Sequence, residues 1–584
     1  MSFLLNSLVL GLAVVGVSAQ RPGGPPGGTG GSPAYTLYQA PLPIPEVIQP
    51  DFSITTKDGR TVQSYSITIE QFTKQIYPDL GAATMVGYNG QAPGPMFRID
   101  RGVETVVRVL NKGPRNAAVH LHGSYNHAPW DGWANDDMAP NQWKDYYYPN
   151  LESGRSIWYH DHTDEITAVN AYFGQAGTYI IHDPAEDALA LPAGDYDVPL
   201  ALSDKTYDAN GDLVSPAGNT FNFFGDTIHV NGQPWPYMNV EPRKYRFRLY
   251  DMSLSRAYDL RIQNPAGNSV PFKVIASDSG LFGSPVSTSN LVMSMGERYE
   301  IVVDFANFKG KKLTMLNGFT AAATTSFANT DKVMQFVVGN TVSDTSNNGA
   351  VPGTLNPNVD WPAPRTTVDH TFSFQLGGGG AQWTINGVPF SDANNRVLAK
   401  PPQGAVELWE LRHAGGPAVH PVHIHLVNLQ VVSRTGGRGS VLPYESAGLK
   451  DTVLLEPGET VRVLAFYGPW DGLFMFHCHN LIHEDNAMMA AFNVTLLEEL
   501  GYPNTQGYAD PEDSRFAAKS YKAAQFKPAA IKKAVKKLAA MNPYKDASAL
   551  ASKAEAHYAA TPFAGEKRTV AAPVVARATA AFVA

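Results

Sequence analysis

Four short clusters of histidine constrain this chain more than any other feature of its sequence. They hold ten of the 16 histidines: His120-Leu121-His122, His160-Asp161-His162, His420-Pro421-Val422-His423-Ile424-His425, and His477-Cys478-His479 followed by His483. On a β-strand, residues i and i+2 point to the same face about 6.5 to 7 Å apart, so each His-x-His pair directs two imidazoles into one space. Four such pairs exceed what one tetrahedral zinc ion binds. The spacing therefore predicts several metal ions. We interpret the six isolated histidines as ordinary core or surface residues: His127, His182, His229, His370, His413 and His557.

The single cysteine, Cys478, predicts a second kind of metal site. A chain with one cysteine forms no internal disulfide, and the default interpretation is a small buried apolar residue. Strand neighbours face opposite sides, so Cys478 points away from His477 and His479. His420, His483 and Met488 are placed to join it. A thiolate, two imidazoles and a weak thioether select copper in a blue-copper electron-transfer site, whereas zinc gains nothing from the methionine.

Composition predicts a large all-β protein. The 584 residues include 52 glycines and 43 prolines, with 43% apolar and only 17% charged residues. From about residue 50 to 500, short alternating stretches of Val, Ile, Thr, Tyr and Phe are separated by turn residues, which is typical of antiparallel sandwiches or barrels. The net charge is −8 and no basic stripe with interleaved aromatics occurs in this part of the chain. Nucleic acid is therefore not an expected partner.

Internal repeats predict three related domains. A glycine turn precedes a strand-like segment at Gly102-Val103-Glu104, Gly296-Glu297-Arg298 and Gly458-Glu459-Thr460. Two Asn-Gly turns, at Asn231-Gly232 and Asn386-Gly387, fall near the expected starts of the second and third copies. We expect domains over 50–190, 191–360 and 361–505, with a linker at Asp344 to Pro364.

The two ends of the chain differ from the middle. Residues 1–19 predict a secretory signal peptide, because an apolar run ends in Val17-Ser18-Ala19. A Gly/Pro-rich leader follows over 20–49, and folding is expected to start near Pro50. The tail over 506–584 is rich in Ala and Lys; from Pro511 onward it has 13 basic and five acidic residues. Phe526 to Met541 could form a basic amphipathic helix. We expect an added surface helix or disordered tail, with docking on the acidic body or on an anionic surface as the alternative. No membrane anchor is expected, and the sequon at Asn493 agrees with export.

The clusters, quoted as HLHG, WYHDH, HPVHIH and HCHNLIHEDNAMM, resemble those of the multicopper oxidases, which include laccases, bilirubin oxidases, ferroxidases and cuprous oxidases. The resemblance covers residues 50 to 500 and looks closest to the fungal bilirubin oxidase and phenol oxidase branch. It implies three consecutive cupredoxin-like Greek-key β-barrel domains and four copper ions, one of type 1, one of type 2 and two of type 3.

Carried over by position, the resemblance assigns each ligand. Cys478, His420, His483 and Met488 would hold the type 1 copper, and His120 and His423 the type 2 copper. The type 3 pair would take the remaining six histidines: His122, His160, His162, His425, His477 and His479. All of these ligands come from the first and third domains, so the second would act as a spacer.

The resemblance also implies the reaction. A reducing substrate would give one electron at a time near an exposed edge of His420 or His483, and Cys478 would connect that site to His477 and His479. Reduction of O2 to two waters consumes four protons, for which Asp131 and Glu484 are candidate relays. The alternative is that Asp131 caps a turn and Glu484 orients a histidine.

The substrate is less constrained. Bilirubin oxidases have a tryptophan two residues before the histidine of HPxHIH, where this chain has Ala418. We therefore expect a more open pocket and a laccase-type phenol oxidase that takes small aromatic donors. Bilirubin oxidation is the nearest alternative. Ferrous or cuprous ion oxidation is less favoured because the 14 methionines are scattered. Noncatalytic copper binding and zinc hydrolysis explain the Cys478 cluster poorly. We expect a secreted monomer.

Overall fold

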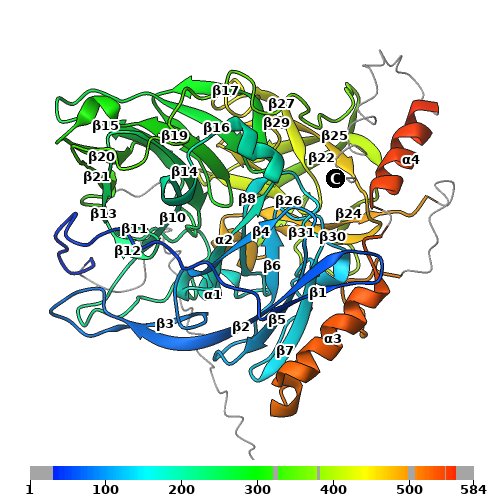
Figure 1. Ribbon diagram of the computed structural model, residues 1–584. Helices are drawn as coiled ribbons and strands as arrows, with labels where there is room; N and C mark the ends of the chain where they lie inside the picture. Colours follow the sequence, from blue (N-terminus) through cyan, green and yellow to red (C-terminus); the bar gives the residue numbers. More distant parts are fainter. Residues whose placement is uncertain (1–30, 320–326, 378–381, 498–506, 546, 561–584) are drawn as a thin grey trace, which may run out of the picture.

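The computed structural model describes residues 31–319, 327–377, 382–497, 507–545 and 547–560, so the predicted signal peptide lies outside the described residues. Three β domains follow one another along the chain (Figure 1). Each consists of two packed sheets, which confirms the all-β prediction. No described helix is long and apolar enough to cross a membrane.

Domain 1 (β1 to β9) is completed by a strand from the C-terminal tail. Its larger sheet contains β1 (Phe52–Thr55), β2 (Thr61–Lys74), β3 (Ala83–Tyr88), β5 (Glu104–Asn111), β7 (Gln142–Tyr148) and β32 (Lys519–Ser520). The smaller sheet contains β4 (Gly94–Asp100), β6 (Val119–His122), β8 (Arg155–Asp161) and β9 (Ala176–His182). Buried aromatic and branched residues such as Tyr65, Phe97 and Ile157 form the core between the sheets.

Domain 2 (β10 to β21) has the largest sheet. This sheet contains β10 (Asp197–Lys205), β11 (Thr227–Val230), β12 (Gln233–Pro234), β14 (Lys244–Asp251), β16 (Phe272–Ser277), β17 (Gly280–Thr288) and β19 (Arg298–Asp304). The facing sheet contains β13 (Tyr237–Val240), β15 (Tyr258–Gln263), β18 (Leu291–Met293), β20 (Lys312–Asn317) and β21 (Lys332–Val338). Phe247, Ile301 and Phe336 are among the residues that fill the space between them.

Domain 3 (β22 to β31) has two sheets of five strands. The first contains β22 (Val368–Leu376), β23 (Trp383–Ile385), β25 (Ala405–His413), β27 (Leu429–Thr435) and β29 (Thr460–Tyr467). The second contains β24 (Val397–Ala399), β26 (His420–Ile424), β28 (Thr452–Leu455), β30 (Gly472–Cys478) and β31 (Met489–Val494).

Among the described residues, helices are few and lie outside the sheets. They are α1 (Thr167–Phe173), α2 (Leu481–Asp485), α3 (Pro528–Met541) and α4 (Ala547–Ala560), with short 3-10 turns that include η1 (Ala128–Trp130). The first two bridge domains 1 and 3, since the backbone N–H of Ala168 in α1 donates to Asp485 of α2 at 3.0 Å.

The glycine repeat is real as a local pattern but does not mark three equivalent strands. Gly102, Gly296 and Gly458 all have positive φ and each precedes a strand. However, β5 pairs in parallel with β2, as β14 does with β10 and β25 with β22. The strands β19 and β29 occupy the next position, which β7 fills in domain 1. The prediction that the three glycines precede equivalent strands is therefore wrong: β19 and β29 are equivalent to β7 and not to β5. Both Asn-Gly turns have positive φ at each residue, as predicted for tight hairpins.

Packed structure begins earlier than the expected start near Pro50. The backbone N–H groups of Tyr38 and Leu42 donate to the carbonyls of Trp235 at 3.0 Å and Tyr237 at 2.7 Å. Leu42 is buried in the domain 2 core. The second half of the leader, from about residue 34, is therefore part of the folded protein rather than a flexible segment.

The described part of the tail also packs on the body, so the expectation of a disordered tail is wrong for these residues, whereas the expected surface helix is confirmed as α3 and the docking alternative is supported. The strand β32 pairs with β7, and α3 buries Ile531, Val535 and Ala539 while its lysines face outward. Further on, the Tyr544 hydroxyl donates to the Tyr147 carbonyl at 2.6 Å, and the Tyr558 hydroxyl to the Gln403 carbonyl at 3.2 Å. The tail thus runs over domain 1 and returns to domain 3 (Figure 1).

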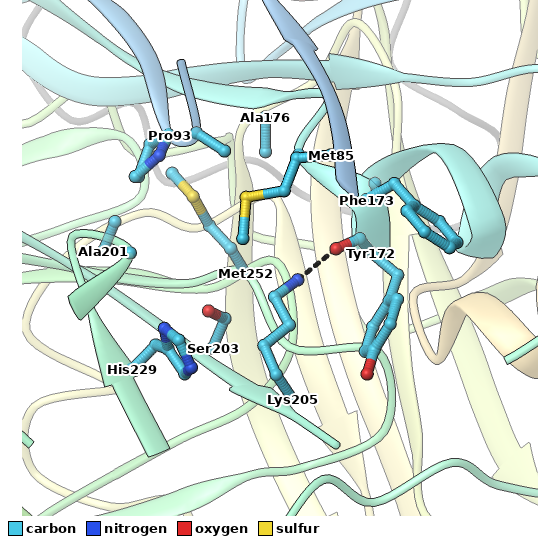
Figure 2. A pocket seen from close by; sticks show the side chains of 14 residues that line it. Met85, Pro93, Tyr172, Phe173, Ala176, Ala201, Ser203, Lys205, His229 and Met252 are labelled. Carbon is cyan, nitrogen blue, oxygen red and sulfur yellow. Dashed lines mark hydrogen bonds between the residues drawn. The ribbon is translucent and has the colours of Figure 1, made fainter. Parts of the chain in front are cut away.

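A cavity of about 40 Å³ lies between domains 1 and 2 (Figure 2). Its lining includes Met85, Tyr172, Lys205, His229 and Met252. The Lys205 ammonium donates to the Tyr172 carbonyl and lies 4.3 Å from the centre of the Tyr172 ring. Burial lowers the pKa of Lys205 from 10.5 to about 8. A half-buried ammonium group thus lies against a carbonyl and an aromatic ring.

We expect Lys205→Met to raise the thermal midpoint at pH 7. The loss of folding stability caused by the buried charge is complete below pH 8, because there the lysine is protonated in both the unfolded and the folded state. It disappears as pH rises from 8 to 10.5. The shift corresponds to at most about 3 kcal/mol, reduced by the carbonyl left without a donor. Scanning calorimetry between pH 7 and 10.5 measures it, with exposed Lys309→Met as the control. An advantage that did not shrink at high pH would contradict this explanation.

Candidate metal centre

Two pairs of antiparallel strands bring the predicted histidines together. In domain 1, β6 and β8 place His120 opposite His160. In domain 3, β26 and β30 place His423 opposite His477 and Val422 opposite Cys478. The two pairs face each other across the domain boundary, where the rings of His122 and His423 stack with centroids 3.7 Å apart. The eight histidines of the four His-x-His pairs are all buried.

Ligand atoms of these histidines form three groups, each spanning no more than 4.8 Å: His120, His423 and His425; His122, His160 and His479; His162, His425 and His477. The Nε2 atoms of His120 and His423 are 3.4 Å apart. The Nε2 atom of His477 lies 3.1 Å from that of His162 and 3.2 Å from that of His425. Every group joins a domain 1 histidine to a domain 3 histidine, so the site exists only where the two domains meet.

Neighbouring oxygen atoms that accept hydrogen bonds determine which ring nitrogen of most of these histidines is available to bind a metal. Six rings have one: His120 Nδ1 to Asp131 O at 2.5 Å, His122 Nε2 to Asp451 Oδ1 at 3.0 Å, His160 Nδ1 to Asp161 O at 2.7 Å, His423 Nδ1 to Asp451 O at 2.9 Å, His425 Nδ1 to Asp131 Oδ2 at 2.7 Å, and His477 Nδ1 to Glu484 Oε2 at 2.9 Å. When one nitrogen donates, the other keeps a lone pair for a metal. His122 Nδ1 and His160 Nε2 have no hydrogen-bond partner among the described residues. Such buried orphan atoms fit metal ions.

The protonation preference of the rings agrees with metal binding. Burial, together with the neighbouring positive charge of Arg298 and other imidazoles, lowers the pKa of His122 well below its usual value. Burial and adjacent imidazoles do the same for the pKa of His423. Neutral imidazoles are the form that binds a metal.

A second group lies beside the first on domain 3. Cys478 Sγ is 3.5 Å from His420 Nδ1 and 3.6 Å from His483 Nδ1, and those two nitrogens are 3.2 Å apart. Met488 is fully buried in the same core and its carbonyl accepts from the Cys478 N–H at 3.0 Å. Burial raises the pKa of the Cys478 thiol well above its usual value, so a bound cation would have to stabilise the thiolate. The donor set fits copper.

The expected exposed edge of His420 or His483 is absent, because the structure buries both imidazoles completely. The predicted opening at Ala418 is also wrong, since Ala418 is 1% exposed and its carbonyl faces His413 Nε2 at 2.6 Å. Backbone and neighbouring rings thus fill the space.

Both candidate proton relays touch the histidine groups. The second oxygen of Asp131 has no hydrogen-bond partner among the described residues, and burial raises the pKa of this carboxyl well above its usual value. Glu484 lies in α2 and is buried between two imidazoles, with Oε1 3.8 Å from His162 Nδ1 and Oε2 2.9 Å from His477 Nδ1. Burial raises its pKa, but His477 and His162 outweigh that effect and lower it below its usual range.

Domain 2 reaches both groups, which the sequence did not predict. The Phe221 carbonyl accepts from His483 Nε2 at 2.6 Å. Arg298 pairs with Asp451, the residue that contacts His122 and His423. The expectation of a simple spacer is therefore incomplete. The His-x-His spacing in the sequence carries no information about an isolated arginine or a backbone carbonyl.

Of the six isolated histidines, most behave as expected. For example, His229 Nε2 contacts the Tyr207 hydroxyl at 3.1 Å and His127 Nε2 the Pro543 carbonyl at 2.9 Å. His413 is an exception, because it lies next to the Cys478 group. Its ring stacks on that of His420 with centroids 4.7 Å apart. It supports a member of the Cys478 group, and nothing in its sequence context indicated this.

Models of the multicopper oxidase family match the chain at residues 71–186, 197–341 and 364–496. The chain belongs to the multicopper oxidase family. It is 51% identical to a bilirubin oxidase of Albifimbria verrucaria, over 85% of this chain and 87% of that protein. A laccase of Haloferax volcanii is 35% identical, over 79% of this chain and 86% of the laccase. Among solved structures, a multicopper oxidase of Aquifex aeolicus is 28% identical with a TM-score of 0.69, covering 79% of this chain and all of that one.

The three β domains of this oxidase are therefore cupredoxin-like, as predicted, and the protein is an oxidoreductase. Its cofactors are four copper ions, one of type 1, one of type 2 and two of type 3, which the histidine groups fit. Reducing substrates and O2 are its reaction partners.

We expect Cys478→Ser to remove the blue absorption and one copper ion while leaving about three ions per molecule, because the three histidine groups do not include the thiol. Metal analysis and the visible spectrum measure this. His229→Gln, a buried histidine outside the clusters, is the matched control and should keep four ions and the colour. Equal loss of all four ions in Cys478→Ser, with the fold intact by circular dichroism, would contradict two separate sites.

Proposed function

We propose that this oxidase removes single electrons from phenols or related aromatic donors and uses four of them to reduce O2 to two waters. The observation that carries the proposal is the covalent continuity of the two sites: Cys478 lies between His477 and His479 in sequence, and the three side chains fall in different groups. Bound copper supplies the one-electron chemistry at both sites. A storage protein would need the ligands but not this connection.

We propose the following ligand assignment. Cys478, His420, His483 and Met488 hold the type 1 copper, and His120 and His423 hold the type 2 copper. The type 3 ions take the groups that contain His122, His160 and His479, and His162, His425 and His477. The groups of ligand atoms within 4.8 Å of one another support this division. Domains over 50–190, 191–360 and 361–505 are part of the same proposal.

Donor electrons enter beside Phe221. Both type 1 imidazoles are buried, and the half-buried residue Phe221 contacts one of them directly, because its carbonyl accepts from His483. Its ring lies 6.2 Å from the His483 ring and 5.5 Å from that of Trp383. An aromatic donor stacked here would approach a ligand through one hydrogen bond.

We expect Phe221→Ala to lower kcat/KM for phenols about 2- to 10-fold, the loss of one aromatic contact of roughly 0.5 to 1.5 kcal/mol. The hydrogen bond to His483 comes from the backbone, so the blue absorption should stay unchanged. Ferrocyanide, a donor without an aromatic ring, is the control and should lose little. Equal losses for both donors would argue against docking at this residue.

Asp131 and Glu484 supply protons and orient ligands at the same time. Asp131 orients His425 through one oxygen, at 2.7 Å, while its other oxygen is free among the described residues to exchange a proton. Glu484 is buried against His477, with Oε2 2.9 Å from its Nδ1.

We expect Asp131→Asn to slow reoxidation of the reduced enzyme by O2 about 100-fold or more while leaving the blue absorption intact. The amide oxygen still accepts from His425, so orientation is kept, whereas the acid function worth about 10²- to 10⁴-fold is lost. Stopped-flow reoxidation measures the effect, with the partly exposed Asp137→Asn as control. Unchanged reoxidation would leave Asp131 with an orienting role only.

Bilirubin is the second candidate donor, favoured by the 51% identity to a bilirubin oxidase. O2 uptake by copper-loaded protein with a panel of phenols, bilirubin, ferrous ion and cuprous ion tests the proposal. Phenols should give the highest rates. Preference for a metal ion, or no O2 uptake with any donor, would refute it. We also propose a secreted monomer, supported by the signal-like segment at 1–19, for which gel filtration of secreted protein is the test.

A further inference from the structure

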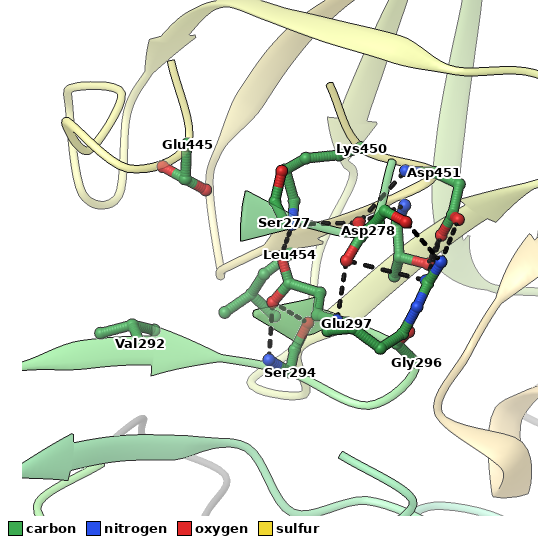
Figure 3. Close-up of polar contacts among 12 residues, drawn as sticks. Ser277, Asp278, Val292, Ser294, Gly296, Glu297, Glu445, Lys450, Asp451 and Leu454 are labelled. Carbon is green, nitrogen blue, oxygen red and sulfur yellow. Dashed lines mark hydrogen bonds and ion pairs between the residues drawn. The ribbon is translucent and has the colours of Figure 1, made fainter. Parts of the chain in front are cut away.

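A cluster of buried charges lies where domain 2 meets domain 3, next to the metal ligands (Figure 3). Domain 2 contributes Asp278, after β16, and Glu297 and Arg298, at the start of β19. Domain 3 contributes Lys450 and Asp451, just before β28. All five residues are at most 2% exposed. Burying three carboxylates and two cations is costly unless every charge is well paired.

Arg298 joins all three domains. Its Nε donates to the Ser156 carbonyl of domain 1 at 3.0 Å. Within domain 2, Nη1 donates to the Gly296 carbonyl at 3.0 Å and Nη2 to the Asp278 carbonyl at 3.1 Å. Toward domain 3, Nη1 and Nη2 each donate to one oxygen of Asp451 at 2.6 Å. The planar guanidinium group thus fixes the orientation of the Asp451 carboxylate.

Asp451 in turn orients two histidines through hydrogen bonds. Its Oδ1 accepts from His122 Nε2 at 3.0 Å, and its backbone carbonyl accepts from His423 Nδ1 at 2.9 Å. Both contacts leave the opposite ring nitrogen free for a metal. Lys450, 3.0 Å from both Asp278 and Glu297, ties the same segment to domain 2 from the other side.

The backbone of domain 2 also touches the ligands directly. Gly296 has φ of +86°, and a Cβ placed there would lie 2.9 Å from the His479 ring and 3.2 Å from His122 Cε1. Gly123, which follows His122, faces Arg298 in the same way, because its Cβ would lie 2.5 Å from Nη2. The first contact places the turn before β19 against two histidines of one group, and the second places Arg298 against the residue that follows one of them.

We propose that the Gly296–Arg298 turn of domain 2 is a positioning element of the histidine groups, acting through Asp451 on His122 and His423. The described part of domain 2 supplies no residue to the ligand groups, yet it fixes the tautomer and ring orientation of one histidine from each neighbouring domain. This inference rests on the proposed assignment of His122 and His423 to the type 3 and type 2 coppers. Arg298 is a positioning residue, because it reaches those ligands only through Asp451.

Arg298→Lys tests the proposal. A lysine keeps the charge but cannot hold both oxygens of Asp451 in one plane. We expect the blue absorption of the Cys478 site to persist, while the copper content falls below four ions and reoxidation by O2 slows about 10- to 100-fold, the usual loss when the partner of a metal ligand is removed. Electron paramagnetic resonance should show an altered type 2 signal.

Two further variants separate positioning from a general loss of stability. Arg243→Lys replaces another fully buried domain 2 arginine, which donates to the carbonyls of Asp344 and Ser346, and should keep all four ions. Gly296→Ala removes no charged group but strains the turn and pushes on His479 and His122, so it should reproduce the cluster defect with the blue absorption intact. If Arg298→Lys fails to fold, the Gly296→Ala variant alone tests whether the turn positions the histidine groups.

Four ions, an unchanged type 2 signal and wild-type reoxidation in both Arg298→Lys and Gly296→Ala would overturn the proposal. A similar loss of copper in Arg243→Lys would also overturn it, because the effect would then be one of stability. Wild-type protein that binds no copper, or binds it without O2 uptake, would instead refute the proposed function on which the inference depends.

Discussion

The packing of domain 1 imidazoles against domain 3 imidazoles is the interaction on which the site depends. His122 stacks on His423 and His120 on His425, with centroids 3.7 and 4.0 Å apart. These rings are buried, and several of their nitrogens have no hydrogen-bond partner among the described residues. Such polar atoms are costly to bury unless metal ions satisfy them, so metal binding and domain association stabilise each other.

The surrounding acceptors explain why the histidines form ordered groups. A ring whose outer nitrogen donates to Asp131, Asp451 or Glu484 has one protonation pattern and one orientation available. Those three carboxylates come from a loop, a pre-strand turn and a short helix. The regular strands therefore set the approximate positions of the rings, and the irregular segments set their final orientation.

The sequence predicted the parts of this arrangement that depend on local spacing. His-x-His on a strand, the separation of Cys478 from its neighbours and the Asn-Gly turns all follow from the backbone period. Contacts between distant segments left no such pattern. Arg298 and Asp451 are 153 positions apart, and Phe221 meets His483 across 262 positions. The burial of His420, His483 and Ala418 likewise depends on packing that no short motif describes.

The path of the C-terminal segment has a consequence for the protein without its ions. The chain leaves domain 3 after β31, adds β32 to domain 1, and comes back to Gln403 of domain 3 through α4. The tail therefore contacts both domains that contribute histidines to the metal site, domain 1 and domain 3. Loss of copper would weaken the contact between those halves, but the tail would still hold the two domains near each other.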